Sequence, residues 1–140
     1  SRGRRSSGNN YQHLYGAILN AACKVLLDVT QERINRYGRA NGDAEQMHYD
    51  PAYARARGFR GTIAHGTMLA APLVDLALRR YGPLFLSAGR IAIKWTAPVC
   101  AGEVQVATID EAGRIEAVND ALPERPVTVR GEATLGGSCT

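Results

Sequence analysis

The stretch that decides the fold is residues 66–80, GTMLAAPLVDLALRR. From Met68 to Leu78, Asp75 is its only charged residue, so a helix formed here is apolar nearly all round. Such a helix is surrounded by other parts of the protein. Arg79 and Arg80 suit the negative end of the helix dipole, and Gly82-Pro83 ends the helix. We therefore expect a long helix from Gly66 to about Arg80 in the middle of the domain.

Short segments rich in strand-forming residues lie on both sides of this helix. Residues 21–29 predict a first strand, and residues 31–40 predict a short amphipathic helix. Four further strands are expected after the long helix, at residues 87–96, 103–110, 114–118 and 127–135. One strand, helices and then a run of antiparallel strands indicate an α+β domain with a sheet wrapped around its long helix.

Length and composition indicate a single globular domain. The chain has 140 residues, of which 45% are hydrophobic and 21% charged. No apolar run approaches the roughly 20 residues that a membrane span requires, so no membrane association is expected. The first ten residues, SRGRRSSGNN, cannot contribute to a core, and we expect a disordered tail at 1–10 followed by one domain at 11–140.

Charge and cysteine content exclude several classes of function. Three arginines of the tail carry most of the formal charge of +4, which leaves +1 for residues 11–140. Nucleic-acid binding is not expected, because no helix-turn-helix pattern, zinc spacing or aromatic-basic interleaving accompanies that charge. Cys23, Cys100 and Cys139 are odd in number and widely spaced, which argues against a disulfide framework and a zinc site. We expect a cytoplasmic protein without metal or cofactor.

A short loop between the two expected helices carries an acid and an imidazole. Asp43 and His48 lie five residues apart, between Gly42 and the Asp50-Pro51 turn signal, which also predicts a short turn of helix. A carboxylate beside a histidine can exchange a proton with a water or hydroxyl near neutral pH. The alternative is an aspartate that only caps a turn.

These residues stand in an order that resembles the MaoC-like family of (R)-specific enoyl-CoA hydratases. The resemblance covers about residues 20–135 and rests on Gly42-Asp43, His48, the run Ile63-Ala64-His65-Gly66-Thr67-Met68-Leu69, and the run Lys94-Trp95-Thr96-Ala97-Pro98-Val99. The family's hydratase motif is Gly-Asp-x-Asn-Pro-aliphatic-His. The acid and the histidine match it in identity and spacing, whereas Glu45-Gln46 replaces the Asn-Pro.

The resemblance implies a hotdog fold, a homodimer with its active site at the interface, and reversible addition of water to a 2-enoyl thioester. By resemblance, Asp43 and His48 would hold and deprotonate the water and return a proton to C2. The amide of Gly66, with that of Thr67, would bind the enolate oxygen at the start of the helix. His65 is grouped with them at the substrate-binding end, where we expect it to cap or orient the helix.

Some residue roles stay open at this stage. Gly66 could serve close helix packing instead of oxyanion binding. Glu45 could be a solvated loop carboxylate or a second acid that replaces the missing Asn. Arg57, Arg60 and Lys94 are candidate phosphate contacts, because a thioester of coenzyme A or of an acyl carrier protein brings phosphate to the site.

Three functions fit these observations. The first is a carbon-oxygen lyase, that is, a hydratase or dehydratase acting on acyl thioesters through Asp43 and His48. The second is a hotdog thioesterase, since a fold alone does not choose the chemistry. The third is a non-catalytic or cyclase-like acyl-binding module. Release of free thiol would indicate the second function, and loss of the conjugated thioester without thiol release would indicate the first.

Overall fold

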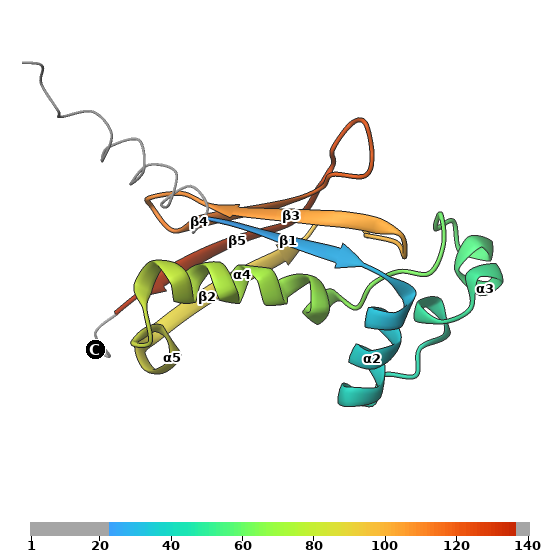
Figure 1. Cartoon of the computed structure of the whole chain (residues 1–140), viewed down its shortest axis with the longest axis horizontal. Coiled ribbons are helices and arrows are strands. Elements are labelled where there is room, and N and C mark those ends of the chain that lie inside the picture. Colours follow the sequence, from blue (N-terminus) through green and yellow to red (C-terminus); the bar gives the residue numbers. More distant parts are fainter. Residues whose placement is uncertain (1–22, 137–140) are drawn as a thin grey trace, which may run out of the picture.

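The computed structural model describes residues 23–136, which form one antiparallel sheet and several helices (Figure 1). The sheet has five strands in the order β1-β3-β4-β5-β2. Their bounds are β1 Lys24–Val29, β2 Gly89–Trp95, β3 Glu103–Ile109, β4 Arg114–Asn119 and β5 Val127–Leu135. All four pairings are antiparallel, with one register shift between β4 and β5 at Ala117/Val118. The predicted disordered tail at 1–10 lies outside the described residues.

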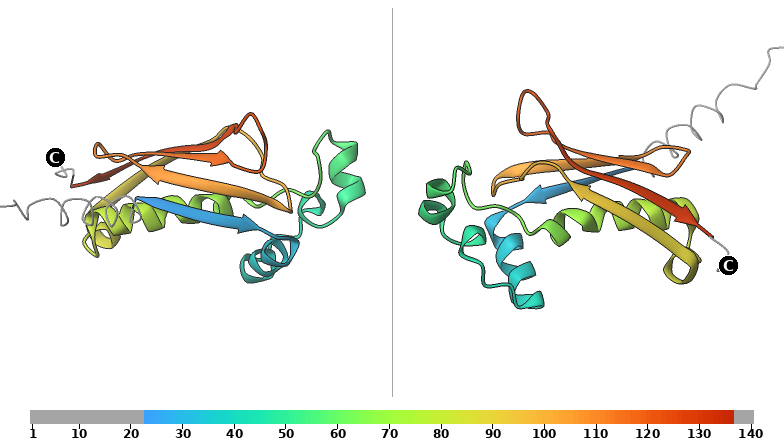
Figure 2. Two further views of the ribbon diagram at one scale, coloured as in Figure 1. Left: turned by 45° about the horizontal axis from the view of Figure 1, so that its top comes forward. Right: turned by 180° about the vertical axis from the view of Figure 1, so that it is seen from behind.

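The long helix α4 (Gly66–Tyr81) lies along one face of this sheet (Figures 1 and 2). Leu73, Leu76 and Ala77 are fully buried against it, together with Val129 and Ala133 of β5. A methyl group at Gly131 of β5 would lie 3.1 Å from Leu73 Cδ2, so the glycine lets helix and sheet approach closely. The α+β fold, with an antiparallel sheet around a central helix as in hotdog proteins, is confirmed.

Pro72 lies inside α4, and the helix continues through it. A proline has no N–H for the carbonyl four residues earlier, and it disturbs the hydrogen bonding of that turn. The buried amide of Gln105 on β3 donates to the adjacent carbonyl of Leu69 at 2.9 Å. Gln105 in turn accepts a hydrogen bond from Thr128 on β5, so a polar pair in the core ties this helix turn to two strands.

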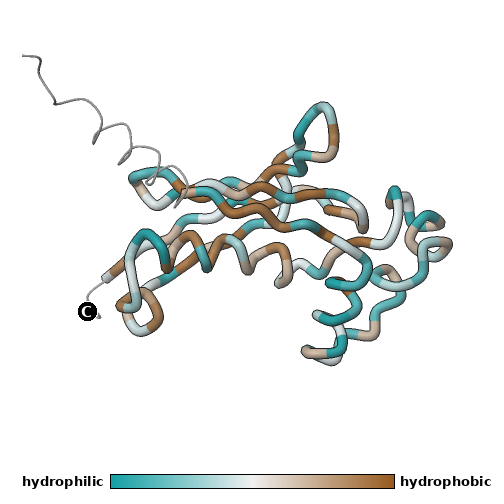
Figure 3. Tube along the Cα trace, viewed as in Figure 1, coloured by the Kyte–Doolittle hydropathy of each residue, from teal (hydrophilic) through white to brown (hydrophobic). Residues whose placement is uncertain are grey.

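The helix is not enclosed on every side in the single chain. Ala71, Arg79 and Arg80 are exposed, and Asp75 pairs with Arg79 at 2.8 Å on this outer face. Hydrophobic residues concentrate along α4 and the strands, whereas α2 and its neighbours are mostly hydrophilic (Figure 3). The prediction that protein surrounds α4 is therefore correct only for its sheet-facing side.

A short helix, α5 (Phe85–Ala88), occupies the start of the segment predicted as a strand at 87–96. The strand β2 begins only at Gly89, where an added methyl group would lie within 2.1 Å of the Phe85 ring. A four-residue helix carries too little periodicity to be recognised from sequence.

Three further helices gather at the end of the sheet where α4 begins (Figure 1). They are α2 (Gln31–Asn41), the 3₁₀ helix η1 (Gln46–His48) and α3 (Pro51–Ala56). Thr30 caps α2. Asp50 caps α3 and Pro51 is its first residue, as the Asp50-Pro51 signal predicts. No helix among residues 23–136 combines the length and apolar character needed to cross a bilayer.

Candidate active site

Asp43 is held in place by the turn that ends α2. Gly42 closes the helix with φ of 76°, a left-handed conformation that favours glycine. The Asp43 N–H donates to Asn41 Oδ1 at 3.0 Å, and its carboxylate Oδ1 accepts the N–H of Glu45 at 3.1 Å. The loop therefore fixes one carboxylate oxygen and leaves Oδ2 to face other elements.

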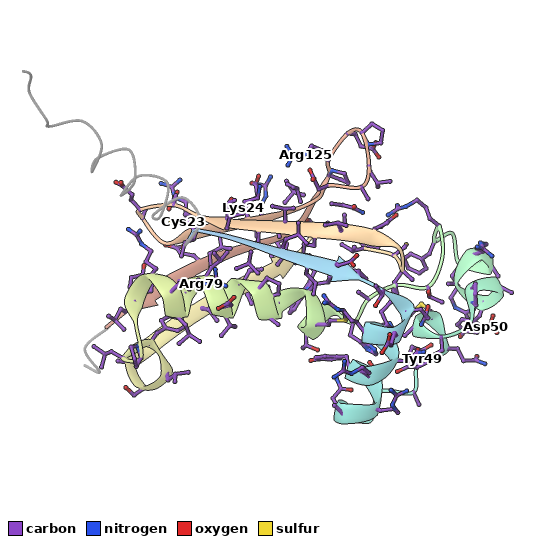
Figure 4. All side chains as sticks on the ribbon, viewed as in Figure 1. Cys23, Lys24, Tyr49, Asp50, Arg79 and Arg125 are labelled. Carbon is purple, nitrogen blue, oxygen red and sulfur yellow. The ribbon has the colours of Figure 1, made fainter. Side chains whose placement is uncertain are left out.

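Tyr49 secures the same loop from the other side. Its hydroxyl donates to the Asp43 carbonyl, and it lies so close to Gly38 of α2 that a methyl group there would collide with it. Figure 4 labels Tyr49 at the end of the molecule where α2 lies. Burial raises the pKa of Tyr49, and the negative charge of Asp43 adds to the rise. Sequence reasoning missed Tyr49, although its place directly after His48 was a signal.

His48 ends η1, is nearly buried, and has a defined tautomer. Its Nδ1 lies 2.7 Å from the carbonyl oxygen of Ile63, which can only accept, so Nδ1 carries the hydrogen. Gln31 of α2 donates to the His48 carbonyl at 2.8 Å and fixes the backbone. The Nε2 atom, 3.5 Å from Asp43 Oδ2, therefore presents its lone pair next to the carboxylate.

His65 lies behind this pair, immediately before α4. Its ring is 2% exposed, with Nδ1 2.9 Å from Asp43 Oδ2 and Nε2 3.1 Å from the Ile34 carbonyl of α2. At the N-cap of α4 it makes no side-chain capping hydrogen bond. His65 is thus the N-cap residue of α4 through its backbone, whose carbonyl accepts the N–H of Leu69 at 3.1 Å, while its ring contacts the acid of the site.

The charge on Asp43 is stabilised by these contacts. The N–H of Glu45 and the ring of His65 both donate to its carboxylate, and together they lower the pKa of Asp43 below its ordinary value. Partial burial opposes this shift, and positive charge on a neighbouring imidazole adds to it. Asp43 is therefore ionised over the pH range in which a histidine titrates.

Asp43, His48 and His65 place one possible metal-ligand atom each within 4.8 Å of one another. The two rings, however, stack with centroids 3.9 Å apart and planes inclined by 30°. Lone pairs in the planes of nearly parallel rings do not converge on one point, as imidazole ligands of a single ion must. The cluster therefore fits a hydrogen-bonded acid-base group better than a metal centre.

The first turn of α4 lies beside this group. Trp95, at the end of β2, donates from Nε1 to the Gly66 carbonyl at 2.7 Å, and a methyl group at Gly66 would lie 3.2 Å from that nitrogen. Gly66 thus allows close packing, which was one of its two expected roles. Tyr37 of α2 donates to Thr67 Oγ1 at 2.7 Å, so Thr67 ties α4 to α2.

An open hollow of about 430 Å³ gives access to the acid. Its lining comes from α2, the Asp43 loop and the residue after η1: Asn35, Gly38, Arg39, Gly42, Asp43, Ala44 and Tyr49. The exposed Glu45 is not part of this lining, and only its backbone N–H contacts Asp43. Asn35 and Arg39 were missed from sequence, where their spacing on one helix was the available signal.

The structure does not bring the predicted phosphate contacts to this hollow. Arg60 forms a two-point ion pair with Glu103 at 2.8 and 3.0 Å, which engages its guanidinium. Arg57 lies over the ring of Tyr53, 3.4 Å from its centroid. Lys94 lines a separate hollow on the sheet with Arg114 and Arg130. None of these three cations lines the hollow beside Asp43.

Comparison with known proteins shows to which family this chain belongs. The family model described as MaoC like domain matches residues 22–132. The chain belongs to the MaoC-like family. The matched range contains every residue of the site described above, so the resemblance seen in the sequence is confirmed.

Individual MaoC-like relatives agree with this assignment. The chain is 32% identical over 117 residues to 3-hydroxyacyl-thioester dehydratase Z of Mycobacterium tuberculosis H37Rv, covering 79% of this chain and 77% of that protein. The fold is similar to that of R-hydratase PhaJ1 from Pseudomonas aeruginosa, with a TM-score of 0.59 and 21% sequence identity. The match covers 79% of this chain and 75% of that one. The fold is also similar to an (R)-hydratase from A. caviae, with a TM-score of 0.59 and 18% sequence identity. The match covers 81% of this chain and 92% of that one.

Proposed function

We propose that this chain is a hydratase or dehydratase that adds or removes water at the 2,3 position of an acyl thioester, and hence a carbon-oxygen lyase. The observation that carries the proposal is the pairing of Asp43 Oδ2 with His48 Nε2 at 3.5 Å, beside the first turn of α4. The 32% identity to a protein named a 3-hydroxyacyl-thioester dehydratase supports the substrate class.

The hydrogen bonds divide the roles of the two side chains. His48 Nδ1 is a donor to Ile63, so its Nε2 has the free lone pair and acts as the base. Asp43 has a lowered pKa, which makes it a weak base and a stable anionic acceptor that orients the water. A water held between Nε2 and Oδ2 would lose its proton to His48.

The reaction then balances with these groups alone. The water oxygen bonds to C3 while the C2–C3 double bond shifts its electrons toward the thioester carbonyl, which becomes an enolate. Backbone N–H groups at the start of α4, those of Gly66 and Thr67, lie at the positive end of the helix dipole and would stabilise that oxygen. Protonated His48 then returns the proton to C2, and dehydration runs the same steps backwards.

The test uses crotonyl-CoA and longer enoyl-CoAs. We expect the conjugated thioester absorbance to fall without release of free thiol, because water adds to C3 and the thioester stays intact. Thiol release at the same rate would indicate a thioesterase. No change in either signal with any chain length would indicate an acyl-binding module.

For the phosphate-bearing end of the substrate, arginines of α2 replace the cations expected from sequence. Arg39 lines the same hollow as Asp43, and Arg36 lines a neighbouring hollow of about 330 Å³ with Arg33, Tyr37 and Met68. Arg36 and Arg39 are exposed and form no ion pair within residues 23–136. This face of α2 would attract the phosphates of coenzyme A or of an acyl carrier protein.

The double variant Arg36→Ala, Arg39→Ala is expected to raise KM for crotonyl-CoA by about threefold to tenfold at low salt, with little change in kcat. The matched control is Arg114→Ala, Arg130→Ala in the separate sheet hollow, which should leave KM unchanged. An enoyl thioester of N-acetylcysteamine lacks phosphate, so its KM should respond to neither pair. An unchanged KM for crotonyl-CoA in the α2 variant would refute this docking surface.

We propose that the chain assembles as a homodimer. Within residues 23–136 the sheet ends at β1 and β2. The outer edge of each pairs with no other strand of this part of the chain, which leaves it available to a second chain. Large apolar side chains lie exposed next to the β2 edge: Leu86 at 76% and Trp95 at 47%. Sedimentation analysis at micromolar concentration should give twice the chain mass, and a monomer that is fully active would contradict the proposal. A cytoplasmic location stays a prediction from sequence.

A further inference from the structure

His65 is a buried ring with an oxygen acceptor at each nitrogen. Nδ1 lies 2.9 Å from Asp43 Oδ2, and Nε2 lies 3.1 Å from the Ile34 carbonyl oxygen. A neutral imidazole has one N–H, so it can donate to only one of these oxygens. Only the doubly protonated ring donates to both, and a buried polar atom facing an acceptor without a hydrogen would be costly.

We propose that His65 is a positioning residue, a fixed imidazolium that holds Asp43 ionised and aimed at the reacting water. The inference rests on the proposed hydratase function for its consequence in catalysis, but not for the protonation state itself. It assigns a third role in the site: His48 moves the proton, Asp43 orients the water, and His65 sets the charge and direction of Asp43 without reaching the substrate.

The surroundings of His65 support a positive charge at this position. The anionic Asp43 is in direct contact, and the Ile34 carbonyl directs its negative end at Nε2. The ring of Tyr37 lies at 5.1 Å and that of Tyr49 at 6.0 Å between centroids, and neither carries positive charge. Among the described residues, the one other histidine is His48, whose ring stacks on that of His65 at 3.9 Å between centroids.

That stack links His65 to the base. If His65 is positive, a second positive charge on His48 directly above it is unfavourable. In the proposed arrangement His48 therefore has its one hydrogen on Nδ1, donated to Ile63, and a free lone pair at Nε2. When His48 has taken the proton of the water, the same repulsion favours its prompt transfer to C2.

The direct test is nitrogen NMR of the wild-type protein with labelled histidine. The chain has three histidines, and the variants His13→Gln and His48→Ala assign their signals. We expect one histidine at neutral pH to show hydrogens on both ring nitrogens, with the signals lost in His65→Asn. A bare nitrogen on His65 would overturn the proposal. This measurement does not require enzymatic activity. Its result is therefore independent of whether the proposed hydratase function is correct.

Kinetics tests the positioning role. His65→Ala is expected to lower kcat on the order of tenfold to a hundredfold with KM little changed, because a misdirected Asp43 misplaces the water. The acidic limb of the pH profile should move to higher pH, because loss of the positive ring stacked on His48 makes protonation of the base easier. His65→Asn, whose amide can donate from near the Nδ1 position, should recover part of kcat. A loss of kcat with an unmoved pH profile and no recovery in His65→Asn would show a merely structural role.

Discussion

Replacing His48 with alanine is expected to lower kcat for crotonyl-CoA hydration by at least about a hundredfold, with KM little changed. The reason is that Nε2 is the nitrogen left free to take the proton of the water, because Nδ1 is used by Ile63 and Asp43 is a weaker base. Initial rates of absorbance loss, measured under saturating substrate, check this expectation.

The matched control for His48→Ala is Gln46→Ala in the same turn of η1. Gln46 is exposed, and only its backbone carbonyl is used, by the N–H groups of Tyr49 and Asp50. Its variant should keep the wild-type rate. Thermal unfolding of both proteins separates loss of chemistry from loss of structure. A His48→Ala protein that is folded and as fast as the control would remove His48 from the mechanism.

The second large effect is expected for Asp43→Asn, which should also lower kcat by about a hundredfold or more. Asparagine keeps the shape of the side chain and can still accept from Glu45, but it removes the negative charge that orients the water and neutralises His65. The matched control is Glu45→Gln, which removes a nearby carboxylate outside the hollow and should leave kcat unchanged. Equal losses in the two variants would instead favour Glu45 as a second acid.

Asp43→Asn is also expected to change how the stability of the folded protein depends on pH. The pKa of Asp43 is lowered in the folded protein, so its stabilising effect is present above its unfolded pKa and is lost as pH falls through the folded pKa. The variant should therefore unfold more easily than wild type at neutral pH, and the difference should shrink in strong acid. Thermal unfolding across this range measures it.

The elements with local signals were predictable from sequence. Helix α4 was found because its composition leaves no polar face to solvent over most of its length, and β5 because its alternation repeats over nine residues. Asp43 and His48 lie in one short loop, so their spacing alone brings them together. The short helices α5 and η1 had no comparable signal, since three or four residues carry no periodicity.

The parts of the site that escaped prediction depend on contacts distant in the chain. His65 meets Asp43 across 22 residues and Ile34 across 31, so its hydrogen bonds follow from how α4 and α2 pack. Arg60 finds Glu103 43 residues away, which no local pattern could indicate. The cations expected from sequence lie outside the hollow that Asp43 lines, whereas Arg39 of α2 lies in it.

The central claim is that Asp43 and His48 direct one water to C3 of an intact enoyl thioester. The most direct measurement is the mass spectrum of the product formed from crotonyl-CoA in water enriched in heavy oxygen. Our account predicts an intact 3-hydroxyacyl thioester with the heavy oxygen on its hydroxyl group, formed by wild type and not by the variant that combines Asp43→Asn with His48→Ala. Heavy oxygen in the carboxylate of a released free acid, or equal labelling by that double variant, would contradict it.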